Sequence, residues 1–435
     1  MIYMAKMDLS YKYGFLGLGL GGTSIAAACA DLSAGDNEYP YTALLVNTNK
    51  QDLDKVKTSN TKIKKELIGD GKGAGRDITI GENIFMENKD KILNLMKTNF
   101  EKTEFIWISA GLGGGSGTGA VIQAIGLCLE MRKPFGLILT LPRKNERSTV
   151  NSNALKRLNK IYAAMDKLGP IIPVDNEKLF TEFMTSNPNA SLEEYLAFSN
   201  EYVAKAIHDK NIITANFDVY GSTNFDSSEL GKMLRTPGVF HFARMEMTVE
   251  EFKELDSLKS MENQKAKFIT NLHTQIENGV LSSGYDFKKT KRAAISVLCH
   301  EQDAQNLFNG VMTNQLENLL LEVAPHATES PVSFHTYSAT QFENVKNDAK
   351  NRPVYFYVML AGLDLPAERI KQMIELDKVA TESIQSSSSN LFENYEESAS
   401  SNNNGALTLD ALFGGESSTP VEKENESLFQ TLGLV

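Results

Sequence analysis

Short apolar runs alternate with longer stretches of helical spacing through the first part of the chain. A run that is apolar throughout predicts a strand covered on both faces, and apolar positions every three to four residues predict an amphipathic helix. The predicted strands are residues 13–19, 41–46, 105–110, 135–141 and 171–174, and the predicted helices are residues 25–31, 83–100, 120–131 and 149–168. This alternation predicts a doubly wound α/β fold with a mostly parallel sheet, whose ligands bind at the carboxyl ends of the strands.

A longer pattern begins at Leu192, where apolar positions keep a helical period as far as Ile213 and predict a long central helix. Beyond it, strands are predicted at residues 239–245, 293–299, 332–337 and 354–361, and helices at 265–277, 314–323 and 366–384. We therefore divide the chain into a nucleotide-binding domain (1–190), a central helix and loop (191–225), a second, smaller α/β domain (226–365), a C-terminal helix (366–385) and a tail (386–435).

The charge of the chain is concentrated in its tail. The 435 residues carry a net charge of −11, and residues 381–435 account for −8 of it through nine acidic residues and one lysine. Runs of serine and asparagine in the same segment predict a disordered acidic tail. The rest of the chain is close to neutral, so no basic face is expected and direct binding of nucleic acid is not predicted.

The cysteines and the hydropathy of the chain indicate where in the cell the protein is expected. Cys29, Cys128 and Cys299 lie in apolar patterns without paired spacing, which predicts buried, reduced thiols rather than disulfides or a metal site. No apolar run approaches the roughly 18 residues of a membrane span, and the first residues lack the pattern of a signal peptide. A cytoplasmic protein without membrane contact is the expectation.

A glycine-rich run lies between the predicted strand 105–110 and the predicted helix 120–131. Glycine allows positive φ angles and leaves no Cβ in the way, so backbone N–H groups can converge on a phosphate. The run comprises Gly113, Gly114, Gly115, Ser116, Gly117, Thr118 and Gly119. The two hydroxyl groups and the start of the helix add further donors, which predicts an oligophosphate cradle. The Gly-Lys-Ser/Thr ending of a P-loop is absent, so the backbone would hold the phosphates.

A second glycine-rich turn follows the first predicted strand, and it has two interpretations. Gly17, Gly19 and Gly22 match the Gly-x-Gly-x-x-Gly fingerprint of dinucleotide-binding proteins. That fingerprint expects an acidic residue after the second strand, where this chain has Asn47-Thr-Asn49. The asparagines count against a dinucleotide oxidoreductase, which remains the less favoured interpretation.

The run from Gly113 to Gly119 resembles the signature with which proteins of the tubulin/FtsZ superfamily hold the phosphates of GTP, with Ser116 in place of the central threonine. The resemblance implies GTP or GDP as the ligand, together with Mg²⁺, and assigns no protein ligand to the metal. It implies three more nucleotide loops: Gly19, Leu20, Gly21 and Gly22; Asn47, Thr48 and Asn49; and Gly73, Ala74, Gly75 and Arg76. In the last loop Arg76 is a candidate cation near the terminal phosphate, and a solvated arginine is the alternative.

The same resemblance implies how the base is recognised. In the family, one asparagine after the sixth strand and another on the central helix contact guanine, and the matching residues here are Asn176 and Asn200. The aromatic residue that usually stacks on the base is replaced by Leu196, so Tyr195 or Phe198 would have to substitute for it. An ordinary polar surface position is the alternative for Asn200.

Asn224, Asp226 and Glu229 resemble the catalytic loop of FtsZ-like GTPases. Two carboxylates on such a loop can orient a water for attack on a γ-phosphate. The alternative is that Asp226 caps a helix in a capping box with Glu229, and both roles can hold together. The loop lies at the far end of the long helix from the phosphate cradle, so two subunits must stack head to tail to bring them together, which predicts a filament-forming GTPase.

Within the superfamily, residues 14–22, 106–108 and 199–202 resemble the plasmid-borne TubZ branch. That resemblance implies segregation or maintenance of plasmid DNA through a DNA-binding adaptor protein on the plasmid centromere. An FtsZ-like cell-division GTPase is one alternative, and a nucleotide-dependent plasmid replication protein that acts on DNA is another. The acidic tail departs from the basic tails of both branches and could reach the neighbouring subunit.

Overall fold

The computed structural model describes residues 7–33, 38–252, 266–339, 341 and 349–388. Within these residues, eleven strands form one sheet in the order β3-β2-β1-β4-β5-β6-β8-β11-β9-β10-β7. The strands are β1 (Tyr13–Leu18), β2 (Thr42–Asn47), β3 (Ile63–Leu67), β4 (Phe105–Gly111), β5 (Phe135–Leu141), β6 (Pro170–Asp175), β7 (Asp218–Val219), β8 (Gly238–Thr248), β9 (Arg292–His300), β10 (Val332–Tyr337) and β11 (Pro353–Leu363).

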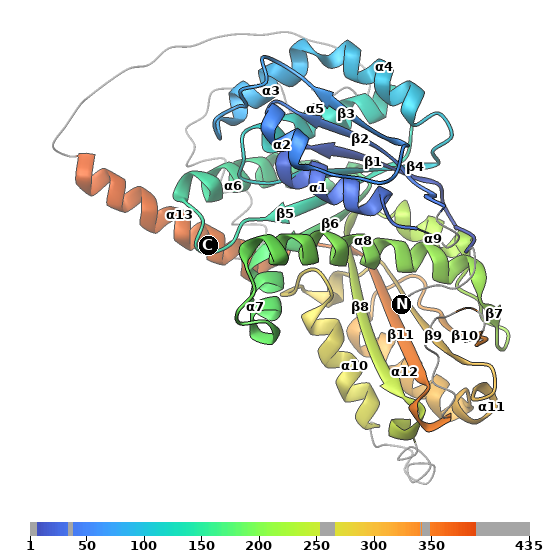
Figure 1. The fold of residues 1–435 in the computed structure, drawn as a ribbon. Coiled ribbons are helices and arrows are strands. Elements are labelled where there is room, and N and C mark those ends of the chain that lie inside the picture. Colours follow the sequence, from blue (N-terminus) through green and yellow to red (C-terminus); the bar gives the residue numbers. More distant parts are fainter. Residues whose placement is uncertain (1–6, 34–37, 253–265, 340, 342–348, 389–435) are drawn as a thin grey trace.

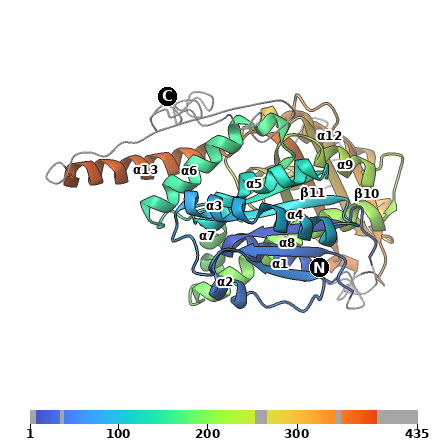
Figure 2. The same cartoon turned by 90° about the horizontal axis from the view of Figure 1, so that it is seen from above.

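Helices cover both faces of this sheet (Figures 1 and 2). They are α1 (Gly19–Ala30), α2 (Lys50–Lys55), α3 (Ile78–Glu87), α4 (Lys89–Asn99), α5 (Ser116–Glu130), α6 (Ser148–Ala163), α7 (Asn176–Ser186), α8 (Leu192–Asn216), α9 (Ser227–Leu234), α10 (Lys267–Asn278), α11 (Ala304–Leu307), α12 (Gly310–Val323) and α13 (Ala367–Ser388). Short 3₁₀ turns occur at η1 (Met165–Lys167), η3 (Phe287–Lys289) and η4 (Ala349–Asn351). One apolar core packs α3 to α6, α10, α12 and α13 on one face, and another packs α1, α2 and α7 to α9 on the other.

The pairing of the strands confirms the predicted doubly wound, mostly parallel sheet. The pairs from β3 through β2, β1, β4, β5 and β6 to β8 are all parallel, and β11 runs antiparallel between β8 and β9. The sheet passes from the first half to the second through the β6–β8 pair, where Pro170 faces Gly238 and Ile171 faces Val239. The division into separate domains stays a prediction, because one sheet runs through both halves.

Several predicted helix boundaries are wrong, and glycine explains the starts of α1 and α5. Helix α6 ends at Ala163, before the predicted residue 168, and α12 begins at Gly310, before the predicted residue 314. Helix α1 begins at Gly19 and α5 at Ser116, inside runs that were assigned to loops. A Cβ on Gly22 would lie 2.1 Å from the carbonyl oxygen of Ser109, so close packing against β4 requires glycine in the first turn of α1. The predicted helix 83–100 is two helices, which meet at Asn88.

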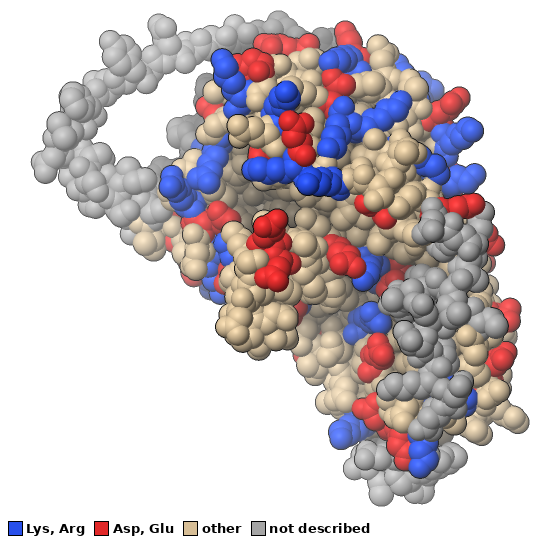
Figure 3. Space-filling view, viewed as in Figure 1, with Lys and Arg blue, Asp and Glu red and all other residues tan. Residues whose placement is uncertain are grey.

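The cysteines, hydropathy and surface charge can be followed within the described residues. Cys29, Cys128 and Cys299 are buried free thiols, as predicted. Among the described helices, none combines the length and apolar character that a membrane span needs. On the face in Figure 3, Lys and Arg side chains of the described residues are interspersed with Asp and Glu, so this face shows no continuous basic surface. Residues 386–388 belong to α13, and the rest of the predicted tail, 389–435, lies outside the described residues.

Candidate functional site

The predicted nucleotide loops gather at one edge of the sheet, because they all follow the carboxyl ends of neighbouring parallel strands. Gly19 follows β1, Asn47 ends β2, the run from Gly113 follows β4, and Asn176 follows β6. The loop of residues 71–77 joins this edge from β3, since Gly73 N donates to the carbonyl of Thr48 at 2.9 Å. The structure therefore brings together the four loops that the sequence predicts.

The glycines of the cradle are required by close backbone contact. Gly19 has φ +64°, and a Cβ on it would lie 2.7 Å from the backbone nitrogen of Gly117. Gly113 has φ +110°, in the region that side chains rarely adopt. Gly114 differs, because it is exposed and a Cβ on it would meet nothing within 4 Å. Gly114 is thus on the open side of the predicted cradle.

Hydroxyl groups join the cradle to its neighbouring loop. Ser116 Oγ lies 2.5 Å from Thr48 Oγ1, a contact between the loops that follow β4 and β2. The hydroxyl of Thr118 is buried, accepts a bond from Gly113 N at 2.9 Å and donates to the carbonyl of Gly111 at 3.2 Å. Thr118 thus holds the shape of the glycine run, and Ser116 as a ligand donor stays a prediction.

The loop that carries Arg76 is strained and anchored. Arg76 has φ +67°, which is uncommon for a residue with a side chain, and its side chain is exposed. Its carbonyl accepts a bond from Asn153 Nδ2 at 2.8 Å, and the same nitrogen donates to the carbonyl of Gly113 at 3.1 Å. Asn153, on α6, thus ties the predicted γ-phosphate loop to the glycine run, and sequence analysis missed it.

The asparagines after β2 order their own loop. Asn47 Oδ1 accepts from Asn49 N at 3.1 Å, and Asn49 Oδ1 in turn caps α2 through Asp52 N at 3.1 Å. Asn47 Nδ2 is buried and has no hydrogen-bond partner among the described residues. A buried donor without a partner is costly, so it suits a ligand acceptor at this edge.

The predicted base-binding residues lie at the beginning of α7 and on α8. Asn176 is the first residue of α7, and its carbonyl accepts a bond from the Tyr195 hydroxyl at 3.0 Å. Tyr195 is 2% exposed and Phe198 stacks between Phe183 and Tyr202, so both aromatic side chains are committed to packing.

Leu196 is 51% exposed, and it lies one helical turn before Asn200 on the same side of α8. Leu196 is thus the exposed side chain beside Asn200, whereas Tyr195 and Phe198 pack against other groups, and which residue covers the base stays a prediction.

The predicted catalytic loop lies at the opposite end of α8 from α7 (Figure 1). Asp226 caps α9, and its Oδ1 accepts from Ser228 N at 2.8 Å and from Glu229 N at 3.2 Å. The capping role is thus confirmed, but the capping box is wrong, since the carboxylate of Glu229 contacts Lys232 Nζ at 2.8 Å instead. Asn224 and Asp226 are exposed, so the loop faces solvent.

The described residues contain no group of three or more His, Cys, Asp or Glu side chains placed to hold a metal ion. Mg²⁺ in nucleotide sites is bound largely by substrate phosphates and waters, with one or two protein oxygens at most. The donor set of the cradle therefore fits a nucleotide whose phosphates carry the metal with them.

Comparison with protein families gives two matches that together cover most of the chain. Residues 14–183 match the "Tubulin/FtsZ family, GTPase domain", and residues 223–367 match the "Tubulin-like protein TubZ, C-terminal domain". The first match contains all four nucleotide loops, and the second begins one residue before Asn224. The C-terminal match favours TubZ over the FtsZ alternative.

Comparison with individual proteins also finds similarity to TubZ. The tubulin-like protein TubZ of Bacillus cereus is 37% identical over 390 residues, which cover 88% of this chain and 86% of that protein. A GTPγS-form protofilament of TubZ from Bacillus thuringiensis serovar israelensis superposes with a TM-score of 0.72 at 18% identity, covering 89% of this chain and 96% of the other. A structure described as the type III plasmid segregation protein TubZ has a TM-score of 0.67 at 18% identity, covering 88% and 95% of the two chains.

Proposed function

Since the chain belongs to the TubZ family of tubulin-like proteins, we propose that it is a GTPase that stacks head to tail into filaments and hydrolyses GTP between adjacent subunits. The filaments act in the segregation or maintenance of plasmid DNA, and plasmid segregation is the role named for a structural relative. The protein works in the cytoplasm, and a DNA-binding adaptor on the plasmid centromere connects the filament to its DNA.

The observation that supports this proposal is the separation of the two halves of the active site. The nucleotide loops lie at the carboxyl edge of the sheet, and Asp226 lies beyond the far end of α8. From Asn200 to Asn216 alone, the helix spans about 24 Å at about 1.5 Å per residue. Asp226 therefore serves the nucleotide of the next subunit, and a head-to-tail contact that does not close gives a filament.

In the bound state the backbone of residues 113–117 and the hydroxyl of Ser116 hold the phosphates, with the first turns of α1 and α5 directed at them. Asn176 and Asn200 contact the guanine, and Arg76 lies in the loop near the terminal phosphate. Mg²⁺, when bound with the phosphates, would supply positive charge close to them.

The catalytic loop contributes an oriented carboxylate. Asp226 is fixed by its two capping bonds through Oδ1, which leaves Oδ2 to accept from the attacking water. The ion pair with Lys232 holds Glu229 beside it as the second acid, and Asn224 lies in the same loop. A carboxylate in this position orients the water in line with the γ-phosphate of the neighbouring subunit.

Turnover of GTP as a function of protein concentration, with light scattering in parallel, tests the proposal. We expect turnover per subunit to rise steeply above a critical concentration as scattering appears. Asp226→Asn keeps the helix cap, because asparagine caps as well as aspartate, and should assemble while losing about 10²-fold or more of the turnover. Turnover proportional to concentration without scattering would contradict the filament and favour a replication protein that acts on DNA as a single subunit.

A further inference from the structure

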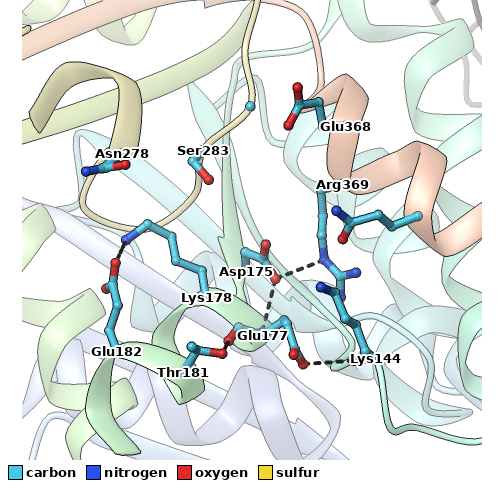
Figure 4. Close-up of a pocket in the computed structure, with 12 residues that line it drawn as sticks. Lys144, Asp175, Glu177, Lys178, Thr181, Glu182, Asn278, Ser283, Glu368 and Arg369 are labelled. Atoms are coloured by element: carbon cyan, nitrogen blue, oxygen red, sulfur yellow. Dashed lines mark hydrogen bonds and ion pairs between the residues drawn. The ribbon is translucent and has the colours of Figure 1, made fainter. Parts of the chain in front are cut away.

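A cavity of about 340 Å³ lies beside the predicted base-binding end of the site (Figure 4). It is lined by α7, by the segment around Ser283 and by the beginning of α13. Arg369 extends from α13 to Asp175 at the end of β6, with its Nε 3.0 Å from Asp175 Oδ1. The side chains of this pair are 5% and 8% exposed, so the C-terminal helix places a buried positive charge at the nucleotide edge.

The guanidinium of Arg369 connects the ends of two adjacent strands. Its Nη2 donates to the carbonyl of Pro142, directly after β5, while Nε pairs with Asp175 on β6. β5 and β6 are parallel neighbours, with Leu141 opposite Asp175. One side chain from the far end of the chain therefore fixes the relative position of two strand ends.

Asp175 connects Arg369 to the first turn of α7 through hydrogen bonds. The same Oδ1 that pairs with Arg369 accepts from Glu177 N at 3.0 Å and so caps the helix. Asp175 N donates to the carbonyl of Leu281 at 2.9 Å, which holds the residue from its other side. Asn176 lies between Asp175 and Glu177, and its position depends directly on these bonds.

We propose that Arg369 is a positioning residue for recognition of the purine base. It acts through Asp175, whose carboxylate it neutralises and orients, to place Asn176 against the edge of guanine opposite Asn200. Without the guanidinium, the carboxylate of Asp175 would be buried and unpaired, and it would turn toward water and release the first turn of α7. This inference rests on the proposed function, because it takes Asn176 and Asn200 as the residues that contact the base.

A second buried arginine provides a matched control. Arg352 pairs with Asp303 through Nε at 2.7 Å and Nη2 at 2.6 Å, and both side chains are 9% exposed. This pair lies in the second half of the chain, among residues that follow β9 and precede β11. Its loss should lower stability as the loss of Arg369 does, without touching the nucleotide edge.

The test is the affinity for GTP, for ITP, which lacks the exocyclic amine of guanine, and for ATP, measured by calorimetry below the concentration of assembly. We expect the parent to prefer GTP over both other nucleotides, and Arg369→Met to lower the preference for GTP over ITP or over ATP by about tenfold, as expected when one hydrogen bond is misplaced. Arg369→Lys should restore part of the preference, and Arg352→Met should leave it unchanged. Asp175→Ala, which removes both the cap of α7 and the partner of the guanidinium, should lower the preference as Arg369→Met does.

The outcomes separate the inference from the proposed function. A parent that binds GTP, ITP and ATP equally would overturn the base assignment itself, and this inference with it. A parent that discriminates, together with Arg369→Met and Asp175→Ala variants of unchanged preference, would overturn the inference alone. If Arg369→Met does not fold, the Asp175→Ala variant decides, and an unchanged preference in it would overturn the inference.

Discussion

Asn153 Nδ2 donates to the carbonyl of Arg76 at 2.8 Å, across 77 positions of the chain. The same nitrogen also reaches the carbonyl of Gly113 at 3.1 Å. One buried amide on α6 thus holds both the predicted γ-phosphate loop and the glycine run, including a residue with strained backbone. The shape of the phosphate site depends on this side chain although no phosphate contact is expected from it.

Replacing Asn153 with Ala should weaken GTP binding about tenfold, because two loops lose their shared hydrogen bonds. Asn60→Ala is the matched control, since Asn60 Nδ2 also donates to two carbonyls, those of Ala30 at 2.6 Å and Tyr41 at 3.0 Å. Both variants should be less stable in thermal unfolding, and only Asn153→Ala should lose affinity in calorimetry. Equal affinities in the two variants would contradict the role of Asn153.

The exposed Leu196 gives a prediction of improved binding. A tyrosine there would offer a ring to the base one turn before Asn200, and stacking on an aromatic ring contributes about 1–3 kcal/mol per base. Leu196→Tyr should therefore tighten GTP binding, by about fivefold at the lower end of that range. Leu321→Tyr, at a 61% exposed position on α12, is the control that should leave affinity unchanged. An unchanged affinity in Leu196→Tyr would place the base elsewhere.

Gly114 offers a way to block the cradle without disturbing the fold. A Cβ there meets no atom within 4 Å, so Gly114→Asp adds a carboxylate where the phosphates are expected. Like charges at close range repel, and GTP binding should fall by about 10²-fold or more. Gly310→Asp, at an equally open position at the start of α12, should bind GTP normally. Normal binding by Gly114→Asp would contradict the position of the cradle.

Buried histidines make stability depend on pH. Burial lowers the pKa of His208 from 6.5 to about 4, against the opposing effect of Asp209, and burial together with Lys178 and Lys210 lowers the pKa of His241 to about 4. Between these values the unfolded chain binds more protons than the folded one, so the free energy of unfolding falls as the pH drops from 6.5 toward 4.

Denaturant unfolding at several pH values checks this effect. His208→Gln keeps an acceptor for the Tyr41 hydroxyl, which lies 2.8 Å from His208 Nδ1, and removes the titration. It should reduce the pH dependence by up to about 1.4 kcal/mol per pH unit in that window. An unchanged slope in this variant would show that His208 does not titrate as its burial implies.

The sequence predicted the parts of the site that depend on local chemistry. A glycine run that predicts a phosphate cradle can be recognised within one loop, because positive φ angles and space around the backbone are local requirements. A fully apolar run such as 135–141 likewise predicts a buried strand from its own residues. It missed β3, whose residues Ile63–Leu67 include two lysines, because an edge strand needs little apolar character.

Contacts between distant residues carried no local signal. Arg369 and Asp175 are 194 positions apart, and the sequence around each residue does not indicate that the two form an ion pair. The starts of α1 and α5 were placed too late for a related reason, since glycine propensity favours a loop while packing requires glycine in the first turn. In both cases packing between residues distant in the sequence determines the structure, and local conformational preference does not indicate it.

Complementation between two inactive variants tests the shared active site most directly. Asp226→Asn has an intact nucleotide cradle and an inactive catalytic loop, and Gly114→Asp has the reverse. Each variant should hydrolyse GTP poorly alone. An equimolar mixture should regain a substantial part of the parent turnover, because some contacts join the intact cradle of one variant to the intact catalytic loop of the other. Co-sedimentation confirms that both variants enter the filament. A mixed filament as inactive as its components would contradict a site completed by the neighbouring subunit.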